Sequence, residues 1–266
     1  GEIGKGKNIR LADEIKEGKI NFYAEEDGIL KVDVEKLLEL NMLGEISFAT
    51  LPDNIPVKKG ELIAGARVIP LVIDKEKMER AQNIISTPIL NVNSYRKYKV
   101  GMVTTGNEVF FGRIEDKFGK IVVDKLKEFD CEVIAQLFSQ DNKEMIKAKA
   151  QELLDMGAEI LIFTGGMSVD PDDVTPSAII EMGGELVSYG SPVLPGSMFL
   201  LSYLGNVPVM GLPGCVMFAK RTIFDLILPR VLSEEKLTTR DIMMYGNGGL
   251  CQSCEVCHYP NCTFGK

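Results

Sequence analysis

Three short glycine-bearing loops follow apolar runs in the second half of the chain, and their residues are suited to binding an anion. They read Thr-Thr-Gly-Asn-Glu at 104–108, Thr-Gly-Gly-Met-Ser at 164–168 and Gly-Leu-Pro-Gly-Cys at 211–215. Glycine lets backbone N–H groups approach an anion closely, and a following helix N-terminus adds positive potential. A single glycine after a strand is explained equally well by the geometry of a turn, without any ligand. Three loops at matching places favour a phosphate-binding site.

Acidic residues stand beside these loops. Asp141 follows one of the apolar runs, and three more follow Thr-Gly-Gly-Met-Ser-Val, namely Asp170, Asp172 and Asp173. Carboxylates next to bound phosphate indicate Mg²⁺, which takes one or two carboxylates and bridges to phosphate oxygens. The alternative is that these side chains only cap helices or close turns. The residues by themselves leave both interpretations open.

Four cysteines crowd into the end of the chain with the spacing C-x2-C-x2-C-x4-C: Cys251, Cys254, Cys257 and Cys262. This spacing lets four thiolates hold one ion or cluster without closing a long loop. In a chain without a secretion signal, such a group indicates metal binding more than disulfides. Zinc and an iron–sulfur cluster both fit, with free or oxidised thiols as the alternative. His258, the only histidine, is either a replacement ligand or polar surface.

Cys215 differs from the tail cysteines because it opens the helix that we expect after Pro213 and Gly214. A helix N-terminus lowers the pKa of a thiol and favours the thiolate. The alternative interpretation is a small buried residue.

Composition limits the partners. The chain has 45% hydrophobic residues, 38 acidic and 30 basic residues and a net charge of −8, without a long basic cluster. The hydrophobic content predicts a folded domain with a hydrophobic core. The negative net charge and the lack of a basic cluster predict no nucleic-acid partner. No apolar run suits a membrane span, and the first residues lack the apolar region of a signal peptide. We therefore expect a cytoplasmic protein without a membrane partner.

Strands alternating with helices are predicted to position the loops. Apolar runs indicate strands at 100–106, 132–138, 160–163 and 208–212, and helical patterns follow at 119–129, 143–156, 175–182 and 217–228, where Thr175 is the expected N-cap of the third helix. This order predicts a three-layer α/β domain with a mainly parallel sheet, whose strands end at one crevice.

The N-terminal part has a different texture, with short strand-like runs punctuated by Gly and Pro that suggest a small barrel or sandwich. A helix is expected after Asp74, and the polar stretch at 91–97 is the predicted linker. We expect a β-rich segment at 1–90, the α/β domain at 98–233 and a cysteine-rich metal-binding tail at 246–266. The start at Gly1 suggests that the β-rich segment is truncated.

Four motifs between Thr104 and Val216 carry a resemblance to a known family. They are Thr-Thr-Gly-Asn-Glu-Val at 104–109, Thr-Gly-Gly-Met-Ser-Val-Asp-Pro-Asp-Asp-Val-Thr-Pro at 164–176, Pro-Val-Leu-Pro-Gly-Ser at 192–197 and Gly-Leu-Pro-Gly-Cys-Val at 211–216. In order and spacing they resemble the molybdopterin-binding domain of molybdenum-cofactor biosynthesis proteins, here as a variant with a cysteine-rich tail. That domain is shared by molybdopterin adenylyltransferases, which use Mg-ATP, and molybdopterin molybdenumtransferases, which insert molybdate.

The resemblance implies roles for individual residues. It places Asp141 and Asp173 at the metal-binding and catalytic acidic positions. It assigns Glu108, Gly165, Gly166, Ser168, Pro213 and Gly214 to cofactor binding, and the positions of Thr105, Gly106 and Cys215 in the same loops add these three to the predicted cofactor-binding residues. It implies molybdopterin and a nucleotide, ATP or AMP, as small-molecule ligands, Mg²⁺ as cofactor, and a homo-oligomer.

The leading hypothesis is therefore a molybdopterin-binding protein that handles adenylated molybdopterin with Mg²⁺ and inserts molybdate. Cys215 and Val216 stand where the molybdenumtransferases show Asn or Ser followed by Pro. This difference favours the alternative, a non-catalytic pterin carrier or sensor whose cysteine tail responds to metal or redox state. A third possibility is a relative that binds another nucleotide, as in the competence-damage protein family. Whether the chain is an enzyme stays open at this point.

Overall fold

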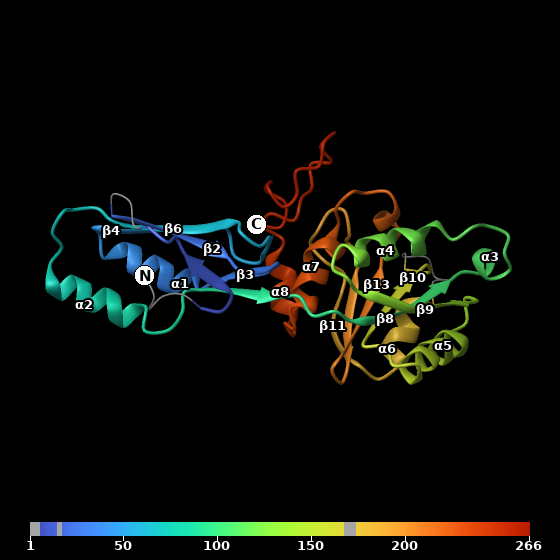
Figure 1. Cartoon of the computed structure of the whole chain (residues 1–266). Coiled ribbons are helices and arrows are strands. Elements are labelled where there is room, and N and C mark those ends of the chain that lie inside the picture. The colour runs from blue at the N-terminus through green and yellow to red at the C-terminus, as the bar shows by residue number, and fades with distance from the viewer. Residues whose placement is uncertain (1–5, 15–17, 168–173) are drawn as a thin grey trace. The chain divides into compact units, whose positions relative to one another are not determined.

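The computed structural model describes residues 6–14, 18–167 and 174–266, and the chain divides into two compact units (Figure 1). One unit covers Gly1–Tyr95 together with Lys266, and the other covers Arg96–Gly265. Each unit buries a hydrophobic core of its own. Ser168 and Asp173, two of the predicted site residues, lie outside the described residues.

The first unit is β-rich, as predicted. Its strands form two antiparallel sheets with the orders β1-β2-β6-β4 and β5-β3-β7. Phe22 and Phe48 from one sheet and Leu30 and Leu90 from the other belong to one buried cluster, so the two sheets share a core. The elements are β1 (Ile9–Leu11), β2 (Lys19–Ala24), β3 (Gly28–Val32), α1 (Val34–Met42), β4 (Ile46–Thr50), β5 (Ile55–Val57), β6 (Leu62–Val68), α2 (Lys75–Ile84) and β7 (Leu90–Ser94).

The predicted linker is wrong in its first half, because Leu90–Ser94 forms strand β7 and pairs with β3. Leu90 and Val92 are fully buried, whereas Asn91 and Asn93 are not. Side chains of a strand alternate between two faces, so every second residue is free to be polar. The asparagines made a strand resemble a loop.

The second unit is a mixed α/β domain, and the predicted fold class is confirmed. Its six-stranded sheet has the order β11-β12-β13-β10-β8-β9, in which β13, β10, β8 and β9 are parallel and β11 and β12 are antiparallel. The elements are β8 (Lys99–Thr105), α3 (Asn107–Phe110), α4 (Lys117–Lys127), β9 (Glu132–Ser139), α5 (Lys143–Asp155), β10 (Ile160–Thr164), α6 (Thr175–Glu181), β11 (Glu185–Tyr189), β12 (Leu200–Leu204), β13 (Val207–Leu212), the 3₁₀ turn η1 (Gly214–Met217), α7 (Ile223–Leu232) and α8 (Thr239–Met244).

The helix expected at 217–228 begins later, at Ile223. Thr222 and Asp225 form a capping box there, which satisfies the free N–H groups of the first turn and sets the start of the helix. The residues directly after Pro213 instead form the short turn η1. The antiparallel strands β11 and β12 were not predicted, because a long Pro- and Gly-containing loop separates them.

Helices cover both faces of the sheet (Figure 1). Helices α5 and α6 pack together on one face, where Ile146 and Ile179 join the buried cluster beneath them. On the other face, α4 and α7 are joined by an ion pair between Lys125 and Asp225. None of the helices in the described part of the chain is long and apolar enough to cross a membrane.

Candidate functional site

The four parallel strands end at the same level. Thr164 of β10 pairs with Thr104 of β8 on one side and with Leu212 of β13 on the other, and Thr105 pairs with Ser139 of β9. The loops that follow these strands therefore emerge at one edge of the sheet, as expected for parallel strands. We call this the glycine-loop edge; it comprises 104–108, 139–142, 165–167 and 213–215.

Buried threonine hydroxyls join the first two loops. The hydroxyls of Thr104 and Thr164 lie 3.0 Å apart, and those of Thr105 and Thr175 lie 2.9 Å apart. Thr175 was predicted to be the N-cap of α6, but Val174 holds that position. The hydroxyl of Thr175 bonds to the first loop instead and ties α6 to β8.

The glycines of the second loop are required by close approach. Gly165 has φ +85°, and a Cβ there would collide with the carbonyl oxygen of Thr105. Gly166 has φ +54°, and its Cβ would lie 2.6 Å from the Thr175 hydroxyl oxygen. Both positions combine a left-handed backbone with a neighbour that leaves no room for a side chain. These glycines therefore interlock the first and second loops.

The third loop contacts the second through Met167, which is buried. A Cβ on Gly211 would lie 2.5 Å from the Met167 methyl carbon, so the methionine packs directly on β13. Gly214 is different, because it is exposed and nothing lies within 4 Å of the place that a Cβ would take. The fold thus has no steric need for glycine at 214, which leaves its backbone free to approach a ligand.

Of the two interpretations of Cys215, the structure excludes the thiol activated by a helix N-terminus. Cys215 lies in the four-residue turn η1 and not at the start of an α-helix, so it lacks the aligned dipoles of a long helix. Burial raises the pKa of its thiol. The alternative interpretation, a partly buried and unactivated side chain, holds for this cysteine.

Asp141 lies beside the first loop. One of its carboxylate oxygens accepts the N–H of Asn107 at 3.1 Å, and the residue is exposed. The helix-capping alternative belongs to its neighbour, because the side chain of Asn142 accepts the N–H of Met145 and caps α5. Glu108 is also exposed at this edge. Asp141 therefore does not cap α5; it accepts the first N–H of α3, and its carboxylate remains exposed.

A polar network behind the first loop was not predicted from the sequence. The amide of Gln136 donates to the Thr104 hydroxyl at 2.7 Å and also bonds to Asp116. Asp116 caps α4 through the N–H groups of Phe118 and Gly119. An Asp directly before a helical pattern is a recognisable cap, but its link to β8 depends on the neighbouring strand β9. The network holds the Thr104 side chain in place.

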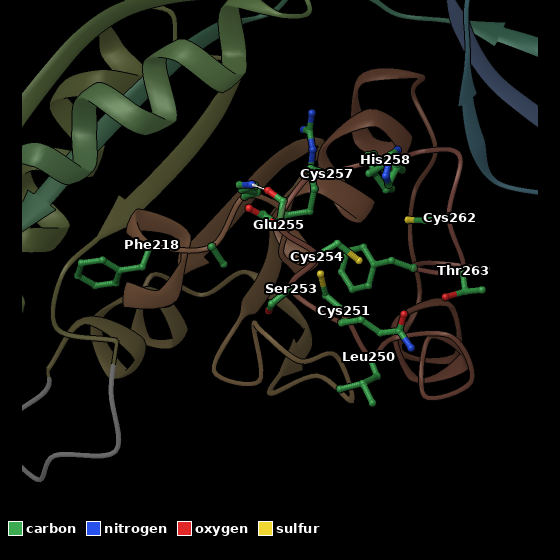
Figure 2. Close-up of a pocket in the computed structure, with 16 residues that line it drawn as sticks. Phe218, Leu250, Cys251, Ser253, Cys254, Glu255, Cys257, His258, Cys262 and Thr263 are labelled. Atoms are coloured by element: carbon green, nitrogen blue, oxygen red, sulfur yellow. Dashed lines mark hydrogen bonds between the residues drawn. The ribbon is translucent and has the colours of Figure 1, made fainter.

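The four tail cysteines line one cavity of about 320 Å³ together with His258 (Figure 2). All six cysteines of the chain lie among the described residues and are free thiols. Throughout the described ranges, no three His, Cys, Asp or Glu side chains lie close enough together to hold a metal ion. The structure thus gathers the thiols around a common space without bringing them to one point.

A parallel sheet whose interlocked glycine loops share one edge defines an α/β ligand-binding domain. The family described as "Probable molybdopterin binding domain" matches residues 101–233, which is half of the chain. The chain belongs to this molybdenum-cofactor biosynthesis family, and the resemblance predicted from the motifs is confirmed.

One relative is a molybdopterin molybdenumtransferase of Haemophilus influenzae, which is 30% identical to this chain over 227 residues. The aligned region covers 77% of this chain and 52% of the relative. A molybdopterin molybdenumtransferase of Synechococcus elongatus is 27% identical over 116 residues, 41% of this chain and 29% of its own length. A CinA-like protein of Mycobacterium avium is 32% identical over 90 residues, 34% of this chain and 21% of its own length. The chain thus spans about half or less of these relatives.

Solved structures also match the chain. The molybdopterin biosynthesis enzyme MoaB of Thermus thermophilus has a TM-score of 0.42 and 21% identity, covering 52% of this chain and 98% of that one. A tungsten cofactor synthesizing protein MoaB of Pyrococcus furiosus has a TM-score of 0.39 and 21% identity, covering 46% and 84%.

Proposed function

We propose that the chain binds molybdopterin at the glycine-loop edge and takes part in molybdenum-cofactor biosynthesis through this site. The observation that carries the proposal is the interlocking of the loops, since Gly165 and Gly166 fit against Thr105 and Thr175 while Gly214 stays open. Exposed backbone N–H groups at such an edge suit the phosphate of the pterin or of its adenylate. The family match supports the choice of ligand.

We further propose that Mg²⁺ bound by Asp141 and Asp173 assists with an adenylated pterin and with molybdate insertion. The exposed carboxylate of Asp141 suits a hard cation that keeps several waters, and Asp173 is assigned by the motif alone. The ion would neutralise phosphate oxygens when bound. The backbone of the loops would orient the phosphate, and the Asn107 N–H would hold the Asp141 carboxylate. A homo-oligomer and a cytoplasmic location remain predictions from the sequence.

Gly214→Ala tests the ligand site without disturbing the fold. Because the added methyl group meets open space, the free energy of unfolding should stay within about 1 kcal/mol of the wild type. The same methyl group would stand between the backbone and a bound phosphate, so molybdopterin affinity should fall at least about tenfold, or 1.4 kcal/mol. Calorimetric titration of anaerobically purified chain measures this, and unchanged affinity would exclude the third loop from the site.

Asp141→Asn tests the magnesium proposal. The amide oxygen can still accept the N–H of Asn107, so the loop should keep its conformation while the charge is lost. We expect the enhancement of pterin or nucleotide binding by Mg²⁺ to fall at least about tenfold, with stability within about 0.5 kcal/mol. Glu144→Gln, which removes another exposed carboxylate from the start of α5, is the matched control. Equal Mg²⁺ dependence in both variants would refute the role of Asp141.

A non-catalytic pterin carrier is the second candidate. It is supported by the partly buried Cys215 and the buried Val216, which occupy the turn where molybdenumtransferases carry Asn or Ser followed by Pro. A carrier should retain pterin tightly and turn over neither ATP nor molybdate. Failure to retain any pterin from an anaerobic host would favour a different nucleotide ligand instead.

A further inference from the structure

The tail at 246–266 is not used by the proposed pterin site, yet it is held firmly against the second unit. Leu194 and the tail exchange backbone hydrogen bonds, from the Leu194 N–H to the Gly249 oxygen at 2.9 Å and from the Cys251 N–H to the Leu194 oxygen at 2.8 Å. The Gly265 N–H bonds to the Gly248 oxygen at 2.9 Å and closes the loop on itself. The cysteines therefore lie on a closed loop with a defined path.

The far end of the loop is anchored on α7. The Tyr259 hydroxyl donates to the backbone oxygen of Asp225 at 3.2 Å, and Phe264 is buried. Gly265 approaches the Leu226 side chain so closely that a Cβ there would lie 2.5 Å from its methyl carbon. Both ends of the loop are thus attached to the domain, and the thiols lie between them.

The thiols face a shared space, which we call the thiol cavity. Cys251, Cys254, Cys257 and Cys262 line its volume of about 320 Å³. The sulfur atoms of Cys251, Cys254 and Cys262 point into the region that the lining residues enclose (Figure 2). Phe264, Leu250 and Phe218 also line this cavity, and of these three side chains Phe264 is buried whereas Leu250 and Phe218 are largely exposed. The cavity therefore places soft ligands against the buried Phe264 on one side.

Two cations stand at the same cavity. Lys220 donates to the Glu255 backbone oxygen at 2.5 Å, and the Arg221 guanidinium lies 5.1 Å from the centre of the Tyr259 ring. Burial disfavours the charged form of Arg221, but the Asp225 carboxylate and a hydrogen bond to Cys257 raise its pKa overall. Positive charge therefore lies beside the sulfur ligands, where it would offset the negative charge of a bound cluster with its four thiolates.

The size of the cavity distinguishes between zinc and an iron–sulfur cluster, the two alternatives that the cysteine spacing allows. In a tetrahedral zinc site with bonds of about 2.3 Å, the four sulfur atoms lie roughly 3.8 Å apart and leave no cavity between them. No such cluster of ligands occurs in the described part of the chain. In a cubane cluster each thiolate binds a different iron, so the sulfur atoms stand apart around an inorganic core. The arrangement of the tail thiols around an open cavity therefore suits an iron–sulfur cluster better than a single zinc ion.

From these observations we propose that the thiol cavity binds a [4Fe–4S] cluster through Cys251, Cys254, Cys257 and Cys262. The two consecutive C-x2-C spacings are those of three ligands of one such cluster in bacterial ferredoxins, and Cys262, after four more residues, would supply the fourth ligand. Two ferrous ions, two ferric ions and four sulfide ions supply the [4Fe–4S]²⁺ core, so no iron or sulfur changes oxidation state on assembly. Each thiol loses its proton to solvent as its sulfur–iron bond forms. His258 lines the cavity and is not a ligand.

The metal content of the whole chain tests the proposal directly. The 266-residue protein is purified without oxygen and reconstituted with ferrous iron, ferric iron in equal amount, and sulfide. We expect about four iron atoms and four acid-labile sulfides per chain, with visible charge-transfer absorption that bleaches on reduction. One zinc per chain and no sulfide would overturn the choice of cluster, and no bound metal would overturn the site.

Substitutions identify the ligands. Cys254→Ser and Cys257→Ser should each lose most of the iron, while His258→Ala, in the same loop, and Cys131→Ser, elsewhere in the unit, should keep it. Far-UV circular dichroism shows whether each variant is folded, and a folded Cys254→Ser protein with full iron content would contradict the ligand set. Loss of iron in the His258→Ala variant would also contradict the proposed ligand set, because His258 is not among the ligands. None of these readouts depends on pterin binding, so the proposal fails or stands separately from the proposed function.

Discussion

Replacing Asp225 by alanine is expected to lower the free energy of unfolding by about 3–5 kcal/mol. The carboxylate is 3% exposed and accepts from Lys125 at 2.5 Å and from Arg221 at 2.9 Å. It also accepts the N–H of Thr222 at 2.8 Å and completes the capping box of α7. Alanine would leave Lys125, which is 11% exposed, without its countercharge in a nearly dry environment. Chemical denaturation measures the loss.

The matched control for Asp225 is Asp124→Ala. Asp124 pairs with Lys127 on the surface of α4, where both side chains are more than half exposed. Exposed pairs contribute little because water screens them, so this variant should change stability by less than about 1 kcal/mol. Asp225→Asn should fall between the two, since an amide can still cap the helix but carries no charge. A stability of Asp225→Ala close to that of Asp124→Ala would show that the buried pair is not a stabilising element.

Gly165→Ala is the second large effect that we expect, because it should damage both the fold and the site. A Cβ at this position meets the carbonyl oxygen of Thr105, and the backbone has φ +85°. The strain of a left-handed alanine and the displacement of a packed loop together should cost about 2–4 kcal/mol. The second loop must then move away from β8, so molybdopterin affinity should fall together with stability.

Comparison with Gly214→Ala makes the Gly165 result specific. Both substitutions add one methyl group at the glycine-loop edge, but only the one at 165 meets protein atoms. We therefore expect thermal unfolding at a lower temperature for Gly165→Ala and an unchanged midpoint for Gly214→Ala. Equal stability of the two variants would mean that the loops are not interlocked as described.

This comparison also separates two roles of glycine that look alike in a sequence. Gly165 and Gly166 are needed by neighbouring protein atoms, whatever the loop binds. Gly214 has no such neighbour, so its proposed role depends on a ligand. The three loops were assigned together from one pattern, and they serve different purposes.

The order of the four parallel strands in the second unit followed from the sequence, because parallel strands buried on both faces appear as continuous apolar runs. β10 (Ile160–Thr164) is fully buried and was predicted at 160–163. Caps formed by local side chains were also predictable: Asp74 accepts the N–H of Glu76 and begins α2 as expected. The family resemblance rested on short contiguous motifs, which need no tertiary information.

Features that depend on contacts distant in the chain were not predictable. Strand β7 is defined by its pairing with β3. The start of α7 is a different case, because its capping box of Thr222 and Asp225 is a local signal that the apolar pattern before it obscured. Thr175 bonds to Thr105, seventy residues away, instead of capping its own helix. Local propensity gives no information on partners that only the folded chain brings together.

By itself, the sequence determined which residues could do chemistry here: the glycine loops, Asp141 and the four tail cysteines. The tertiary structure decided how they are arranged. It aligned the strand ends so that the loops interlock, it partly buried Cys215 and so raised the pKa of its thiol, and it spread the tail thiols around a cavity. The physical reason is that residue type sets what a side chain can bind or donate, whereas burial and distance depend on the whole fold.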